Sequence, residues 1–258
     1  MLSIPEIIKK YGILANKKLG QNFLINEEIC KKIAASGGIS KDDLIVEIGG
    51  GLGSLTRFLI SNLTENAKLL IIEKDVRFIP ILKQEYPQNF ELIMEDALKF
   101  DFANLGAFKV IANLPYNIGT ELLTSWITLN NRPQTMVLML QKEVVQRIIA
   151  KPRTKDYGRL SVISQSFYNC EKLFDVSKGS FNPEPNVTSS VIKMTKKDCI
   201  FDANKLATLT EKLFSSRRKI LKNALKSLNI LRPEFENKRA EELEINDFLS
   251  LLTLPLKL

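Results

Sequence analysis

A glycine-rich turn directly after an apolar run is the feature that most restricts the fold of this chain. Residues 44–48 are apolar apart from one acid and have the length of a buried strand. The chain continues as Gly49-Gly50-Gly51-Leu52-Gly53, and a helical pattern runs from Ser54 to about Asn62. Four glycines in five positions let the backbone approach a ligand closely, which a plain strand-to-helix turn does not need. The pattern predicts the start of a Rossmann-like α/β domain.

The spacing of these glycines distinguishes two cofactor classes. The dinucleotide fingerprint needs glycine or alanine at position 54, which is serine here. An acid followed by glycines at alternate positions, as in Glu47-x-Gly49-x-Gly51-x-Gly53, instead fits the loop that binds S-adenosylmethionine. We therefore expect S-adenosylmethionine to be the cofactor.

Acidic side chains follow the next two predicted strands. The strand over 69–72 ends in Glu73, where a carboxylate can accept both hydroxyl hydrogens of a ribose. The strand over 91–94 is followed by Asp96, which can accept from an adenine amine. A single acid of this kind is more often a helix cap or a surface charge. Their recurrence at successive strand ends predicts a nucleoside site at this edge of the sheet.

The tetrapeptide Asn113-Leu114-Pro115-Tyr116 follows a fourth apolar run and precedes a helical pattern over 118–129. Pro115 has no N–H and pushes Leu114 toward an extended conformation, so the turn is stiff. The Asn113 amide oxygen and the Leu114 carbonyl can then accept both hydrogens of an exocyclic amine, while the Tyr116 ring stacks on a planar base. Taken alone, these four residues favour an ordinary turn with a buried tyrosine. The glycine loop and the acids shift the balance toward a base-binding site.

A second stiff loop lies farther along the chain. Two runs, 171–176 and 189–194, predict a hairpin, and Phe181 to Val187 between them contains two prolines. The loop either connects the strands or presents Phe181 as a second wall for a stacked base. The remaining patterns predict helices over 26–36, 76–86, 141–149 and 157–167 and a strand over 135–140.

Charge and residue types limit the chemistry and the partners. The chain has 37 Lys+Arg against 29 Asp+Glu, a net charge of +8, which favours a polyanionic partner, nucleic acid before a membrane surface. It has no histidine, which excludes Ser-His-Asp and Cys-His catalysis. Its three cysteines lack metal-ligand spacing, so we expect free thiols and no metal. With no membrane-spanning run and no signal peptide pattern, we expect a cytoplasmic protein, and nothing demands more than a monomer.

The two ends of the chain are basic. Residues 1–25 include four lysines and end in a polar-aromatic patch, 19–24, that can fold back over a site. After Asp198 the spacing becomes helical, and we expect helices over 203–214, 217–228 and 240–251. Arg217-Arg218-Lys219 and Lys222 lie at a helix start, where cations are unfavourable unless phosphates complete the site. We expect a basic arm over 1–25, an S-adenosylmethionine-binding α/β domain over 26–198 and a helical RNA-binding domain over 199–258.

Together these segments resemble the ribosomal RNA adenine dimethyltransferases over essentially the whole chain. The matching segments are Lys18–Leu24, Glu47–Gly53, Glu73, Asp96-Ala97, Asn113–Tyr116, Gln141–Val144, Tyr157–Val162 and Phe181–Val191. The resemblance implies a seven-stranded Rossmann-like domain with a small all-helical C-terminal domain. It also implies that methyl groups pass from S-adenosylmethionine to N6 of two adjacent adenosines near the 3′ end of small-subunit (16S) rRNA, in a ribosomal subunit precursor.

The resemblance also assigns roles to residues. It implies that Asn22 and Leu24 fold over the cofactor, that Gly49 lies near its methionine part, and that Glu73 and Asp96 hold its ribose and adenine. It makes Asn113 the bridge between cofactor and target. The catalytic residues expected on this basis are Asn113, Leu114, Tyr116 and Phe181. One departure is Gly50, where the family usually carries proline, and a looser loop is expected there.

Two relatives supply alternative functions. One is the macrolide-resistance methyltransferase, which acts on large-subunit rRNA. The other is a mitochondrial transcription factor with the same fold, which suggests an rRNA-binding ribosome-assembly module in which methylation is secondary. The 157–162 segment and the loop at Phe181 favour the small-subunit enzyme.

Overall fold

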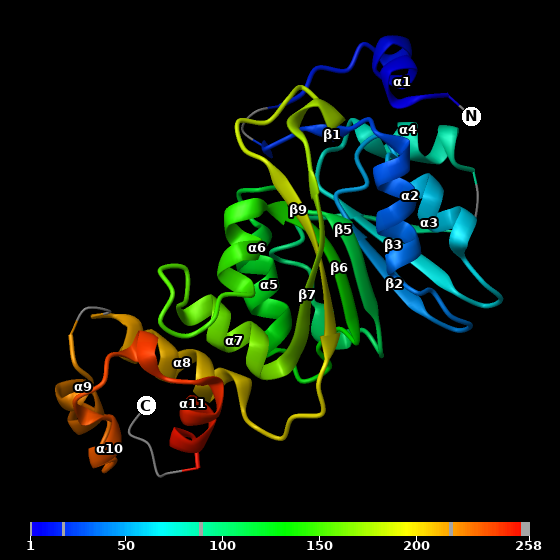
Figure 1. Ribbon diagram of the computed structural model, residues 1–258. Coiled ribbons are helices and arrows are strands. Elements are labelled where there is room, and N and C mark those ends of the chain that lie inside the picture. Colours follow the sequence, from blue (N-terminus) through cyan, green and yellow to red (C-terminus); the bar gives the residue numbers. More distant parts are fainter. Residues whose placement is uncertain (1, 17–18, 88–89, 217–218, 254–258) are drawn as a thin grey trace.

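The computed structural model describes residues 2–16, 19–87, 90–216 and 219–253 (Figure 1). Its centre is a seven-stranded sheet in the order β4-β3-β2-β5-β6-β9-β7. The strands are β2 (Leu44–Ile48), β3 (Lys68–Glu73), β4 (Glu91–Met94), β5 (Lys109–Asn113), β6 (Thr135–Gln141), β7 (Tyr168–Val176) and β9 (Ser189–Lys196). The first five strands in this order are parallel, and β9 runs antiparallel to both β6 and β7. The predicted Rossmann-like sheet and the predicted hairpin of its last two strands are confirmed.

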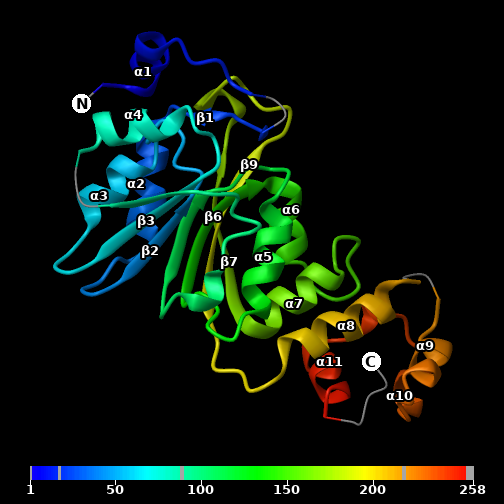
Figure 2. The same cartoon turned by 180° about the vertical axis from the view of Figure 1, so that it is seen from behind.

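Helices cover both faces of the sheet (Figures 1 and 2). One face carries α2 (Glu27–Ser36), α3 (Thr56–Asn62) and α4 (Phe78–Glu85), and the other carries α5 (Gly119–Thr128), α6 (Lys142–Ile148) and α7 (Arg159–Phe167). Neighbouring residues of one strand pack on opposite faces of the sheet, because side chains alternate along a strand. Thus Ile45 packs with Ile33 of α2, whereas Val46 belongs to the cluster that contains Trp126 of α5.

The glycine loop is longer than the sequence predicted. Helix α3 begins at Thr56, two residues later than expected, because the Gly53 N–H donates to the Gly50 carbonyl at 2.8 Å and keeps the chain in a turn. Gly53 has φ +82°, and a Cβ there would lie 2.0 Å from the Tyr86 ring. Only glycine fits that position.

The N-terminal arm is a packed element, which the sequence analysis did not predict. It contains α1 (Ile4–Tyr11), whose start is capped by reciprocal hydrogen bonds between Ser3 and Glu6. Ile4 and Ile7 are fully buried in a cluster with Phe78 of α4. The arm ends in β1 (Phe23–Leu24), which pairs antiparallel with β8 (Phe181–Asn182).

The C-terminal helices extend the hydrophobic cluster on one face of the sheet. They are α8 (Ala203–Phe214), α9 (Lys222–Ser227), α10 (Pro233–Glu236) and α11 (Ile245–Leu251), of which α8 and α11 pack against α7. Helix α8 has its predicted bounds, but the helix expected over 240–251 is broken, because the backbone at Glu244 is extended (φ −75°, ψ 162°) and caps α11. The helix expected over 217–228 is seen from Lys222, and Arg217 and Arg218 lie outside the described residues.

The same hydrophobic cluster contains Trp126 of α5, Phe167 of α7, Leu206 of α8 and Phe248 of α11. The helical segment therefore shares its core with one face of the sheet, and the domain boundary at residue 199 stays a prediction. Among the described residues, no helix has both the length and the apolar character needed to cross a membrane.

Candidate functional site

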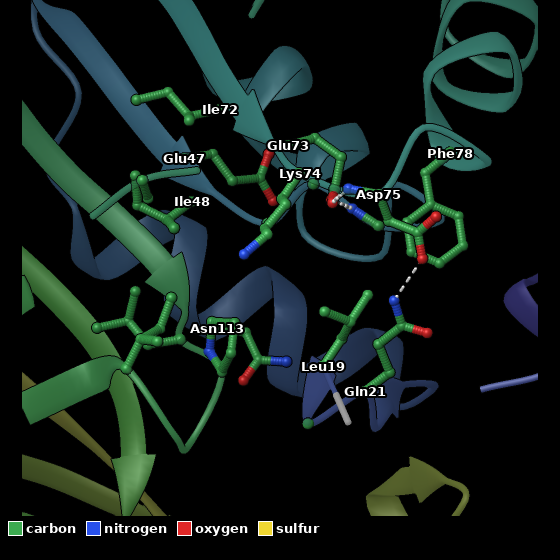
Figure 3. Close-up of a pocket in the computed structure, with 18 of the residues that line it drawn as sticks. Leu19, Gln21, Glu47, Ile48, Ile72, Glu73, Lys74, Asp75, Phe78 and Asn113 are labelled. Atoms are coloured by element: carbon green, nitrogen blue, oxygen red, sulfur yellow. Dashed lines mark hydrogen bonds between the residues drawn. The ribbon is translucent and has the colours of Figure 1, made fainter. Parts of the chain in front are cut away.

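A pocket lies at the carboxyl ends of the parallel strands, where open α/β sheets bind ligands (Figure 3). Its wall includes residues 47–52 at the end of β2 and beyond it, 72–75 at the end of β3, 95–98 after β4, and 113–118 at the end of β5 and beyond it. Residues 19–24 of the arm close it, as the sequence predicted. Five separate segments of the chain thus meet in one cavity.

Glu73 is the acid at the end of β3. Its side chain is buried, with 6% exposed, and it accepts the Gly51 N–H at 2.9 Å and the Asp75 N–H at 2.7 Å. Burial raises the pKa of Glu73 above its usual value, and the two N–H donors act in the opposite direction. Each carboxylate oxygen accepts one of these bonds and keeps a lone pair for a ligand. The residue therefore holds the glycine loop and can still accept a diol.

Asp96 is the acid after β4. It accepts from Lys74 Nζ at 2.7 Å and from the Leu98 N–H at 3.1 Å. The hydrogen bond from Lys74 lowers the pKa of Asp96, so the carboxylate is ionised at neutral pH and can accept from an amine. Lys74 was not among the predicted site residues, although it lines the pocket beside Glu73 (Figure 3).

Glu47 is a site residue to which the sequence analysis gave no role. It is the single acid of β2, is 2% exposed, and accepts from Thr56 Oγ1 at 2.7 Å. Burial raises the pKa of Glu47 to about 8, so the carboxyl is mainly protonated at pH 7. The signal in the sequence was an acid within an otherwise apolar strand.

The turn after β5 is held by backbone hydrogen bonds at both of its ends. The Leu114 N–H donates to the Met139 carbonyl at 3.2 Å, and the Pro115 carbonyl accepts the Gly119 N–H at 3.1 Å at the start of α5. The Asn113 amide and the Glu73 carboxylate belong to different walls of the same pocket (Figure 3). The Tyr116 hydroxyl lies 2.6 Å from the hydroxyl of buried Ser189, and burial raises the Tyr116 pKa.

The arm is fixed to the pocket by a polar cluster that the sequence did not reveal. Gln21 Nε2 donates to Asp75 Oδ2 at 2.7 Å (Figure 3). Arg77 binds Asp75 at 2.6 Å and donates to the Leu14 carbonyl at 3.1 Å. Hydrogen bonds from the Arg77 guanidinium lower the pKa of Asp75 to about 2. Asn22 and Leu24 line the pocket on this arm, and their expected contact with the cofactor stays a prediction.

Phe181 is the one predicted site residue that the structure does not bring to the pocket. Its side chain is 3% exposed, does not line the cavity, and packs with Leu24, Val176 and Val191. Pairing of β8 with β1 turns the ring into the core, so the expectation that the loop presents it as a stacking wall is corrected. Within the described ranges no group of three acids or cysteines fits a metal ion.

Comparison with known proteins gives consistent matches. The family model described as "Ribosomal RNA adenine dimethylase" matches residues 12–252. The Ribosomal RNA small subunit methyltransferase A of Bartonella henselae is 41% identical, covering 97% of this chain and 96% of that protein. A dimethyladenosine transferase from Plasmodium falciparum superposes with a TM-score of 0.77 at 28% identity, covering 88% of this chain and 95% of its own. The 23S rRNA methyltransferase ErmE shares the fold, with a TM-score of 0.65 at 21% identity, covering 90% of this chain and 98% of its own.

Proposed function

The chain belongs to the ribosomal RNA adenine dimethylase family, and from this we propose that it dimethylates N6 of two adjacent adenosines near the 3′ end of 16S rRNA. The substrate would be a ribosomal subunit precursor in the cytoplasm, and the enzyme would act as a monomer. The observation that carries the proposal is the meeting of Glu73, Asp96 and the Asn113–Tyr116 turn in one pocket.

The pocket residues fit S-adenosylmethionine. Glu73 has free lone pairs for a ribose diol, and Asp96 is an ionised acceptor for the adenine amine. Gly49 and Gly51 have φ of +72° and +54°, which gives a bare backbone surface beside the expected methionine part. Asn22 and Leu24 would cover the cofactor from the arm. When bound, S-adenosylmethionine supplies an electrophilic methyl group on its sulfonium.

The Asn113–Tyr116 turn would prepare the target amine. The N6 lone pair of adenine is delocalised into the ring, so the free amine is a poor nucleophile. If the Asn113 amide oxygen and the Leu114 carbonyl accept its two hydrogens, the nitrogen is drawn toward a tetrahedral shape and its lone pair points at the methyl group. Tyr116 would stack on the extruded base, an interaction worth roughly 1–3 kcal/mol.

No general base is needed in this scheme. The amine proton leaves to water after transfer, which suits a chain without histidine. After one methylation a single amine hydrogen remains, and one acceptor is enough for the second round.

The large-subunit alternative is less well supported. The Bartonella henselae relative that matches nearly the whole chain is named for the small subunit, whereas the likeness to ErmE, at 21% identity, concerns the fold alone. The assembly-module alternative predicts rRNA binding without efficient transfer. The two proposals differ in the role of Asn113, because only ours requires its amide oxygen to position the target amine for transfer.

Methyl transfer from labelled S-adenosylmethionine tests the proposal. Small and large ribosomal subunits from cells that lack the modification are incubated separately with the protein, and mass spectrometry locates the product. We expect N6,N6-dimethyladenosine at two adjacent positions of 16S rRNA only. Asn113→Ala should slow transfer at least about 100-fold while the protein stays folded, because positioning of the amine is lost. Full activity of this variant would rule out positioning of the amine by Asn113. Product on the large subunit alone would rule out small-subunit rRNA as the substrate.

A further inference from the structure

The segment from Arg147, in the last turn of α6, to Arg159, the first residue of α7, is strongly basic. It holds five cations, Arg147, Lys151, Arg153, Lys155 and Arg159, against one carboxylate, Asp156. The first four are exposed, and Arg159 is half-buried. In the described part of the chain, the one ion pair formed by these five cations joins Arg159 to Glu211, 3.3 Å apart on α8. We call these five residues the 147–159 surface.

The backbone that carries the 147–159 surface is fixed from two sides. On one side, Gln165 Nε2 of α7 donates to the carbonyls of Ile148 and Ala150, each at 2.8 Å. On the other side, the Arg153 N–H donates to the Glu241 carbonyl at 2.8 Å, and the buried Tyr157 hydroxyl donates to the Leu243 carbonyl at 2.9 Å. The cations therefore project from a rigid base, and binding a ligand there does not require the loop to be ordered.

A groove runs beside the 147–159 surface. Arg147, Lys155 and Arg159 line it together with Asp156 and the aromatic ring of Phe214 at the end of α8. No residue of this groove lines the pocket described above. In both views the loop between α6 and α7 projects on the side of α8, whereas the arm that closes the pocket lies at the opposite end of the sheet (Figures 1 and 2).

The chemistry of the 147–159 surface suits a chain of phosphates. Several unpaired cations spread over a rigid loop match a polyanion, and a guanidinium binds phosphate through two parallel hydrogen bonds. A membrane surface would also need apolar side chains for insertion. Among the described residues, the exposed large hydrophobic side chains all lie outside 147–159. The surface therefore fits the backbone of a nucleic acid.

We propose that the 147–159 surface is a second RNA-binding site, which holds the sugar–phosphate backbone of the rRNA while a base enters the pocket. This proposal rests on the proposed function, because rRNA is the polyanion that the enzyme meets. It also differs from the phosphate contacts expected at the two basic ends of the chain. Those contacts are expected at Lys9, Lys10, Lys17 and Lys18 of the arm and at Arg217, Arg218, Lys219 and Lys222, of which Lys17, Lys18, Arg217 and Arg218 lie outside the described residues. The rRNA would then be bound at two separate places on the protein.

The test neutralises three exposed cations at once. The variant is Arg147→Gln, Lys151→Gln and Lys155→Gln, and its matched control is Lys32→Gln, Lys68→Gln and Lys83→Gln, three exposed lysines elsewhere with the same change in charge. Binding to small ribosomal subunits is measured between 0.05 and 0.3 M KCl, together with steady-state methyl transfer and calorimetric binding of S-adenosylmethionine. Thermal melting checks that both variants are folded.

We expect the variant, but not the control, to have a shallower plot of log affinity against log salt, by about 2 units for three lost phosphate contacts. The KM for subunits should rise about tenfold at 0.15 M KCl, with kcat within about twofold and cofactor affinity unchanged. Equal changes in variant and control would overturn the proposal, because net charge alone would explain them. A variant with unchanged salt dependence and unchanged KM would also overturn it.

Binding to vesicles that contain anionic lipid is measured as a separate test. If the variant loses binding to vesicles but keeps binding to subunits, the surface faces a membrane and the proposal is wrong. Failure of the proposed function is recognised separately, because the protein without substitutions would then not methylate small subunits, whether or not it binds them.

Discussion

The hydrogen bond of the Tyr116 hydroxyl changes the expected effect of the conservative substitution Tyr116→Phe. A ring that only stacks on a base predicts that Tyr116→Phe is silent, but this hydroxyl lies 2.6 Å from Ser189 Oγ, which is fully buried. Tyr116→Phe should therefore cost about 1–3 kcal/mol of stability through an unpaired hydroxyl, and slow transfer severalfold by loosening the ring. Ser189→Ala should reproduce the kinetic effect, and Tyr116→Ala should exceed both. Methyl transfer is assayed in variants whose cofactor binding is intact. If Tyr116→Phe were as inactive as Asn113→Ala, the hydroxyl would have a chemical role.

Glu47 should make stability depend on pH. Its pKa is raised to about 8 in the folded protein, so the folded state binds more protons than the unfolded state above the ordinary value of 4.5. The stability contribution is therefore present at low pH and falls as pH rises from about 5 to 8, by up to about 1.4 kcal/mol per pH unit. Glu47→Gln keeps an acceptor for Thr56 and removes the titration. Urea unfolding at several pH values should give a flatter profile for the variant; parallel profiles would contradict the assignment.

Elements that form short apolar runs in the sequence were predictable, and elements stabilised by distant partners were not. The strands 44–48 and 91–94 have their predicted bounds, because strands of a parallel sheet form short continuous apolar runs. Helix α1 is only eight residues long, and its stability comes from burying Ile4 and Ile7 against Phe78, far away in the sequence. Likewise, Glu73 and Asp96 were identifiable at strand ends, whereas the contact between Gln21 and Asp75 arises only from the fold.

The arm and the turn after β3 should act as one unit in cofactor binding. Arg77 joins Asp75 to the Leu14 carbonyl, and Asp75 in turn holds Gln21 over the pocket. Arg77→Ala should weaken S-adenosylmethionine binding about 3- to 30-fold, because ordering of the arm must then be achieved on binding. Calorimetry measures the affinity, and hydrogen exchange of the arm should rise in the same variant. Lys83→Ala on α4, an exposed lysine, is the control. Unchanged exchange would mean that Arg77 does not fix the arm.

At the scale of the whole molecule, the shared core predicts one unfolding transition. Leu206 of α8 is fully buried in the cluster that also contains Trp126 and Phe167. Leu206→Ala should lower the free energy of unfolding by about 2–5 kcal/mol, and the single calorimetric transition should move as a whole. A separate early transition would instead show that residues 199–258 unfold independently, as a domain of their own.

The pairing of β1 with β8 also fixes when the pocket can be completed during synthesis. Phe23 pairs with Asn182, so the ribosome makes the second half of this ribbon about 160 residues after the first, a delay of roughly 10–30 s at ordinary rates of synthesis. Until then the arm lacks the partner strand that fixes its end beside the glycine loop. A nascent chain that already has its first strands is therefore expected to leave the cofactor cavity open. The enzyme becomes competent only late in its own translation, when most of its chain has emerged.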